Sequence, residues 1–123
     1  MATIRRFEDI QAWQKARLLT REIYRISSTG KFERDYALRD QIRRAAVSSM
    51  SNIAEGFARK TTRDFAHFLD VARGSAAETQ SLLYVAFDAG YIGGDQLEAL
   101  YAATDEVIAL IAGLTSYLRR NRD

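Results

Sequence analysis

The chain has 123 residues, of which 47% are hydrophobic and 28% are charged, as in an ordinary globular domain. This length fits a single domain spanning residues 1–123. There is no cysteine, which excludes disulfides, thiolate metal sites and cysteine nucleophiles. There is also no proline, which suits long uninterrupted helices and disfavours a loop-rich β domain.

No segment predicts secretion, a membrane span or a bound cofactor. The start has no apolar run typical of a signal peptide, and the most apolar stretch, 107–114, is far shorter than the roughly 20 residues of a membrane span. Asp64 and His67 are spaced like one ligand motif of a di-iron bundle, but that site needs the motif twice and His67 is the single histidine. We expect a cytoplasmic protein without a metal, a cofactor or a small-molecule substrate.

The net charge of +2 hides an uneven distribution along the chain. Residues 1–63 carry 14 basic and 7 acidic side chains, whereas residues 64–123 carry 4 basic and 9 acidic ones. An arginine-rich half can bind phosphate groups, or the two halves can neutralise each other within the fold or between subunits. Arginine forms bidentate contacts with carboxylate and phosphate alike, so the excess of arginine over lysine leaves both interpretations open.

Apolar residues repeat along the chain at alternating spacings of three and four residues, and this pattern predicts four amphipathic helices. We expect these helices over about 8–27, 35–59, 62–89 and 95–120. Because the connections are short, successive helices should be antiparallel neighbours. The predicted fold class is therefore all-α, an up-down-up-down four-helix bundle with shallow crossing angles.

The predicted helix ends carry their own signals. Gly30 and Gly90 follow helix C-termini and are expected to adopt positive φ. A threonine at 61–62 is expected to cap the third helix. Asp95 with Glu98 resembles a capping box at the start of the fourth.

The expected third helix has apolar residues on a second face, away from the bundle. Val71, Tyr84 and Val85 lie there, where a monomeric bundle would contact water. A face of this kind is typically covered by another subunit, so we expect a homo-oligomer.

Three glycines lie inside the expected helices, namely Gly56, Gly74 and Gly113. Because glycine costs helix stability, we expect a neighbouring backbone to come close at each of them.

Polar residues form a stripe along the expected second helix and continue on the third. They are Ser48, Asn52, Glu55, Ser75 and Glu78. An asparagine one turn from a glutamate is compatible with catalysis, but such stripes more often form hydrogen-bonded networks that fix helix register. We therefore expect a structural polar network, no catalytic residue and no enzymatic activity.

Basic side chains gather in short groups that are suited to contact phosphates. The candidate nucleic-acid-binding residues are Arg39, Arg43, Arg44, Arg59, Lys60 and Arg63. In an antiparallel bundle the connection at 59–63 lies at the same end as both termini, so the arginines at 5–6 and 119–122 should assist. This arrangement predicts RNA or DNA as a partner, and the alternative is a solvated, salt-bridged surface.

Three segments carry a resemblance to a known family. They are the opening helix at 7–16, the segment 41–59 with its Asn-Ile-Ala-Glu-Gly string, and the stretch 64–79 followed by the turn 90–92. Together they resemble the bacterial four-helix-bundle family of 23S ribosomal RNA intervening-sequence proteins over nearly the whole chain. One position departs from the pattern, because Glu33 follows Phe32 where many members have proline.

The resemblance implies a homopentameric barrel of four-helix bundles. Some members are encoded inside inserts in 23S rRNA genes, and relatives are accessory proteins of diversity-generating retroelements that bind nucleic acid and reverse transcriptase. We therefore predict a non-enzymatic, homopentameric accessory protein associated with RNA or DNA. The alternative is a self-associating scaffold that binds only itself or a partner protein.

Overall fold

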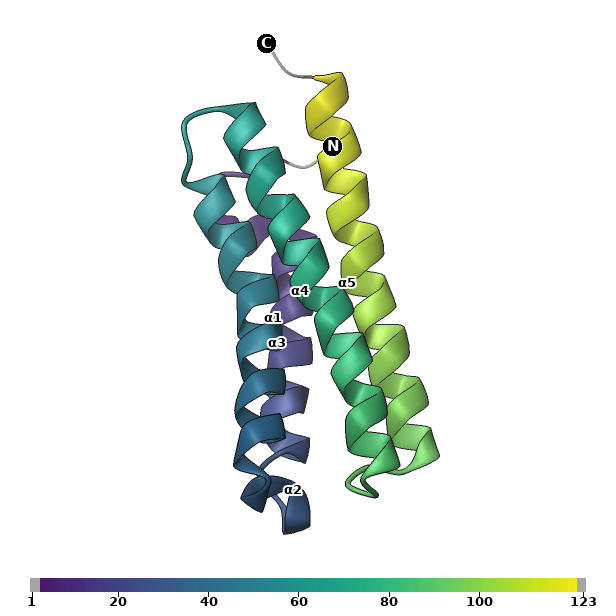
Figure 1. The fold of residues 1–123 in the computed structure, drawn as a ribbon. Helices are drawn as coiled ribbons and strands as arrows, with labels where there is room; N and C mark the ends of the chain where they lie inside the picture. The colour runs from purple at the N-terminus through teal and green to yellow at the C-terminus, as the bar shows by residue number, and fades with distance from the viewer. Residues whose placement is uncertain (1–2, 122–123) are drawn as a thin grey trace.

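A computed structural model describes residues 3–121, and all regular structure in this range is helical. The four long helices lie side by side (Figure 1), and they are α1 (Gln11–Ile26), α3 (Tyr36–Phe57), α4 (Thr62–Asp88) and α5 (Gly94–Arg120). Two short elements precede α1 and α3, namely the 3-10 helix η1 (Phe7–Asp9) and α2 (Gly30–Arg34). The prediction of an all-helical chain is confirmed for these residues. None of the described helices combines the length and apolar character needed to cross a membrane.

The long helices form a closed ring of neighbours around one core. Helix α3 packs against α1 and α4, while α5 packs against α4 and α1. Successive long helices run in opposite directions (Figure 1). The start of η1, the end of α5 and the α3–α4 connection (58–61) therefore lie at one end, which we call the terminal end. The α1–α3 connection (27–35) and the α4–α5 turn (89–93) lie at the other, which we call the α2 end.

The core consists of aliphatic side chains contributed by all four long helices. Ile23, Ile42, Leu83 and Ile111 are fully buried, one from each helix. Burial of each such side chain stabilises the fold by about 1.5–3 kcal/mol. Buried threonines donate their hydroxyls to the carbonyl oxygen one turn earlier, and these are Thr20, Thr79, Thr104 and Thr115.

Several predicted helix-end signals are confirmed. Gly30 and Gly90 have φ values of +58° and +80°, in the left-handed region that favours glycine. The Oγ1 atom of Thr61 accepts a hydrogen bond from the N–H of Asp64 at 3.0 Å and caps α4. The chain thus reverses at both ends of the bundle where the sequence predicts.

The start of α5 differs from its prediction. The helix begins at Gly94, so Asp95 lies inside the first turn and Gly93 is the N-cap residue. The predicted capping box of Asp95 and Glu98 is therefore wrong. Instead, Oε1 of Gln96 accepts a hydrogen bond from the N–H of Gly93 at 2.9 Å.

Helix α2 was not predicted, and the expected helix over 8–27 is divided. The chain forms η1, passes Ile10 in an extended conformation and starts α1 at Gln11. In α2, Phe32 is only 1% exposed and its ring stacks on that of Tyr91, with 5.1 Å between ring centres. The short helix thus covers the core at the α2 end.

Only one of the three glycines that were predicted to mark a close approach has one within the chain. A Cβ atom at Gly56 would lie 2.8 Å from Cβ of Phe68, so α3 and α4 nearly touch there. Nothing lies within 4 Å of a Cβ at Gly74 or Gly113. The prediction of a close approach is confirmed for Gly56 and is wrong for the other two.

Candidate nucleic-acid interface

The six candidate cations form two groups at opposite ends of α3. Arg39, Arg43 and Arg44 lie in its first turns, at the α2 end. Arg59, Lys60 and Arg63 lie after its last turn, at the terminal end. With a rise of about 1.5 Å per residue, the helix separates the two groups by about 24 Å. The six residues therefore do not form a single site.

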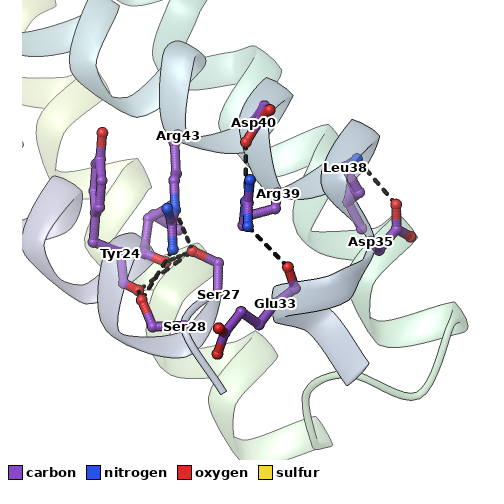
Figure 2. A network of polar contacts seen from close by, with 10 residues as sticks. Tyr24, Ser27, Ser28, Glu33, Asp35, Leu38, Arg39, Asp40 and Arg43 are labelled. Atoms are coloured by element: carbon purple, nitrogen blue, oxygen red, sulfur yellow. Dashed lines mark hydrogen bonds and ion pairs between the residues drawn. The ribbon is translucent and has the colours of Figure 1, made fainter. Parts of the chain in front are cut away.

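Arg43 is held by the last turn of α1 (Figure 2). Its Nε donates to Oγ of Ser27 at 2.8 Å, and its Nη2 donates to Oγ of Ser28 at 2.9 Å. Its guanidinium carbon lies 4.5 Å from the ring centre of Tyr24. Both serine hydroxyls donate in turn to main-chain carbonyl oxygens of α1. Arg43 therefore joins α3 to the C-terminal end of α1, where the helix dipole favours a cation.

Arg39 is also occupied by contacts within the chain. Its Nε donates to Oδ1 of Asp40 at 3.0 Å, and its Nη1 donates to the carbonyl oxygen of Glu33 at 3.0 Å (Figure 2). Its guanidinium stacks over the ring of Tyr36 at 4.8 Å. Arg44 differs, because it is exposed and makes no salt bridge within residues 3–121.

The carboxylate of Asp35 links two connections at the α2 end. Its Oδ1 accepts a hydrogen bond from the N–H of Leu38 at 3.2 Å and caps α3. Its Oδ2 accepts a hydrogen bond from the hydroxyl of Tyr91 at 2.9 Å. The hydrogen bond to Asp35 raises the pKa of Tyr91 above its ordinary value. The α4–α5 turn is thereby tied to the start of α3.

The cations at the terminal end have fewer partners. Arg59 donates to Oε1 of Glu55 at 3.1 Å and lies 4.6 Å from the ring centre of Phe68. Lys60 and Arg63 are exposed, and neither forms a salt bridge in the part of the chain that the structure describes. Both charges are therefore available to an anionic ligand.

A shallow pocket beside Arg63 also contains His67 and Asp70, which were not among the predicted binding residues. Its lining includes Arg63, His67 and Asp70 from α4 and Arg119 from α5. Arg119 donates to Oδ2 of Asp70 at 3.3 Å, which joins the end of α5 to α4. The spacing of four between residues 63 and 67 was the available signal, because it places both on one helix face. Of the terminal arginines, Arg122 lies outside the described residues.

The predicted polar network is assembled in part. Oγ of Ser48 lies 2.8 Å from Oγ of Ser75, and Nδ2 of Asn52 donates to Oγ of Ser48 at 2.9 Å. These half-buried contacts join α3 to α4. The two glutamates, Glu55 and Glu78, are exposed and bond to other residues, so they lie outside this network.

Salt bridges between the basic and acidic halves of the chain are sparse. Among the six salt bridges in the described residues, only that from Nζ of Lys15 to Oε1 of Glu106, at 3.7 Å, joins the two halves. The first half keeps exposed arginines without a salt bridge in residues 3–121, including Arg17, Arg21 and Arg44. The two halves therefore do not neutralise each other inside the described fold.

Comparison with known proteins identifies similar chains. Residues 8–113 match a family described as 23S rRNA-intervening sequence protein. Five solved chains match, among them a protein with unknown function from the S23 ribosomal protein family of Bacteroides thetaiotaomicron VPI-5482. That structure has a TM-score of 0.78 and 22% identity, covering 85% of this chain and 95% of its own, so the likeness shows the fold. No curated protein matches the chain.

Proposed function

This chain belongs to the 23S rRNA-intervening sequence protein family, and we propose that it is a non-enzymatic, homopentameric accessory protein that binds RNA or DNA in the cytoplasm. Each protomer is an up-down-up-down antiparallel four-helix bundle whose terminal end contacts the nucleic acid. The contacts of Asn52 and Ser75 with Ser48 support a structural role for the polar stripe, because these side chains are occupied by one another.

The observation that carries the proposal is a set of unpaired cations at the terminal end. These cations come from three segments of the sequence, are exposed and form no salt bridge among residues 3–121, and they are Arg5, Lys60, Arg63 and Arg120. Phosphate groups bind such cations with release of counterions, whatever the base sequence. Arg63 also lies in the first turn of α4, where the helix dipole favours an anion.

Self-association is supported by the outer face of α4. Val71, Tyr84 and Val85 are 41%, 50% and 47% exposed, so this helix presents apolar area to water in a single protomer. In a ring of copies with parallel helix axes, all terminal ends lie on the same face. The cations then act together on one polyanion, and the resulting avidity exceeds the affinity of one protomer. The number of five subunits follows the family resemblance.

An RNA retention assay over a range of salt concentrations tests the function. Wild-type protein is expected to retain RNA at low salt, and log affinity should fall with log salt by about 0.7 per phosphate contact for a single strand and about 0.9 for a duplex. The Lys60→Gln/Arg63→Gln variant should weaken binding and reduce this slope by about two. The matched control is Lys31→Gln/Arg34→Gln, which removes the same charge from exposed positions at the α2 end. Failure of wild type to retain either RNA or DNA at low salt would overturn the proposal, and equal losses in both variants would overturn the placement at the terminal end.

A further inference from the structure

The outer groove between α1 and α3 is basic. It is lined by Tyr24, Asp40, Arg43, Arg44, Val47 and Ser48. Arg17 and Arg21 lie on the same stripe of α1 as Tyr24, and Arg43 contacts that stripe from α3. The one carboxylate in the lining, Asp40, already pairs with an arginine. We call this surface the basic groove.

The outer groove between α4 and α5 is acidic. It is lined by Tyr84, Leu97, Glu98, Tyr101, Ala102 and Asp105. Glu98 forms no salt bridge within residues 3–121, and Asp105 accepts a hydrogen bond from the neutral Gln80 at 2.7 Å. Neither carboxylate therefore forms a salt bridge with a cation of the same chain within residues 3–121. We call this surface the acidic groove.

Each groove also carries aromatic or aliphatic area. Tyr24 and Val47 in the basic groove are 43% and 36% exposed. Tyr84 in the acidic groove is half exposed, and its ring meets that of Tyr101 edge-on, with 6.0 Å between ring centres. A contact between the grooves would thus bury apolar surface as well as pair charges, which is what a stable protein interface requires.

The two grooves lie on opposite sides of the helix ring. Helices α1 and α3 are neighbours, as are α4 and α5, and each pair forms one side (Figure 1). Both grooves lie in the half of the molecule nearer the α2 end, because Arg44 is in the first turns of α3 and Glu98 is in the first turns of α5. Two different patches pair head to tail rather than about a twofold axis. Their equal height adds no rise along the bundle axis, so copies related by a rotation that closes form a ring.

We propose that the basic groove of one copy of this chain binds the acidic groove of the next, so that copies close into a head-to-tail ring. The inference rests on the proposed self-association and adds the surfaces that make the contact. Arg21 and Arg44 are exposed on one side of the contact, and Glu98 and Asp105 on the other. The terminal end remains outside the contact, and its cations stay available to nucleic acid.

Charge reversal tests the pairing through the native mass. The Arg21→Glu/Arg44→Glu variant has two acidic grooves, and the Glu98→Lys/Asp105→Lys variant has two basic grooves. Each is expected to raise the dissociation constant of the assembly by about a hundredfold or more, because like charges would then face each other. Sedimentation velocity over a range of protein concentrations at low salt measures this, and circular dichroism checks that each variant is folded.

Two further samples show whether the grooves touch each other. A chain with all four substitutions has its charges exchanged, so it should regain the wild-type mass. A mixture of the two double variants should form complexes that contain both chains, although neither variant assembles alone. The matched control, Lys60→Glu/Arg63→Glu, makes the same charge change at the terminal end and should keep the wild-type mass.

The outcomes separate this inference from the proposed function. A wild-type protein that is monomeric at every concentration would overturn both self-association and the groove pairing. An oligomeric wild type whose mass survives either double reversal would overturn the groove pairing alone. Loss of assembly in both double variants, with no recovery in the four-substitution chain or in the mixture, would also overturn the pairing, since charge complementarity would then not explain the loss.

Discussion

The two ends of the bundle carry the same kinds of basic side chain in different surroundings. At the α2 end, Arg39 and Arg43 are held by a carboxylate, a carbonyl oxygen and two serine hydroxyls of the same chain. At the terminal end, Lys60 and Arg63 are exposed and form no salt bridge in the described part of the chain. An arginine is therefore free to bind a phosphate only where the surrounding side chains and carbonyl groups offer it no acceptor.

Helix direction explains part of this contrast. Arg43 reaches the C-terminal end of α1, where two serine hydroxyls accept its hydrogen bonds and the helix dipole attracts a cation. Arg63 lies in the first turn of α4, where the dipole opposes a cation and favours an anion. A phosphate bound near Arg63 would offset the unfavourable interaction between its charge and the α4 dipole. An anion near Arg43 would instead compete with the hydrogen bonds from Arg43 to Ser27 and Ser28.

The largest effect is expected from Gly56→Ala, because the terminal end depends on the close approach of α3 and α4. The new Cβ would lie 2.8 Å from Cβ of Phe68 and 3.2 Å from the carbonyl oxygen of Phe65. Neither atom can move without shifting a helix, so overpacking should lower the free energy of unfolding by about 1–3 kcal/mol. Chemical denaturation measures this change.

Gly74→Ala is the matched control for that substitution. Nothing lies within 4 Å of a Cβ at Gly74, so the variant should gain roughly 1 kcal/mol from the higher helix propensity of alanine. A Gly56→Ala protein as stable as the Gly74→Ala protein would show that the two helices adjust freely and that the terminal end is not fixed by this contact.

The four long helices were predictable because each buries one continuous face. Spacings of three and four place Ile23, Ile42, Leu83 and Ile111 on those faces, and all four are fully buried. Helix α2 was not predictable in this way, because five residues are too few to show a helical period. Its one buried side chain, Phe32, gives no repeating pattern.

It was less predictable which candidate side chains are occupied by contacts within the chain, because this depends on how the helices pack against each other. Spacing along α3 indicates that Arg39 and Arg43 share a face. It does not indicate that Ser27 and Ser28, which directly follow α1, lie opposite Arg43, since that depends on the relative height of two helices. The same limit applies to Glu55, whose spacing from Asn52 suits a network although the folded side chain turns to an arginine instead.

The Arg43→Ala variant measures how much Arg43 at the α2 end contributes to the free energy of unfolding. The variant loses two hydrogen bonds and a stacking contact with Tyr24, so the free energy of unfolding should fall by about 1–2 kcal/mol. Arg63→Ala, the matched change at the terminal end, should alter it by less than about 0.5 kcal/mol. Denaturant titration of both variants at one protein concentration makes the comparison. Equal losses of unfolding free energy in the two variants would mean that Arg43 and Arg63 contribute equally to stability and that the two ends do not differ.

The smallest effect is expected from Tyr91→Phe, which removes only the hydroxyl that donates to Asp35. That hydrogen bond raises the pKa of Tyr91 in the folded protein above its unfolded value, which for tyrosine is about 10. Its stabilising contribution is therefore complete below about pH 10 and is lost as the pH rises through the higher folded-state value. The variant should melt slightly below wild type at pH 7–9, and the difference should shrink at more alkaline pH. Tyr24→Phe is the control, because the described residues give the Tyr24 hydroxyl no hydrogen bond. Equal melting temperatures of Tyr91→Phe and wild type at pH 7–9 would show that ring packing on Phe32, rather than the hydroxyl, ties the two connections together.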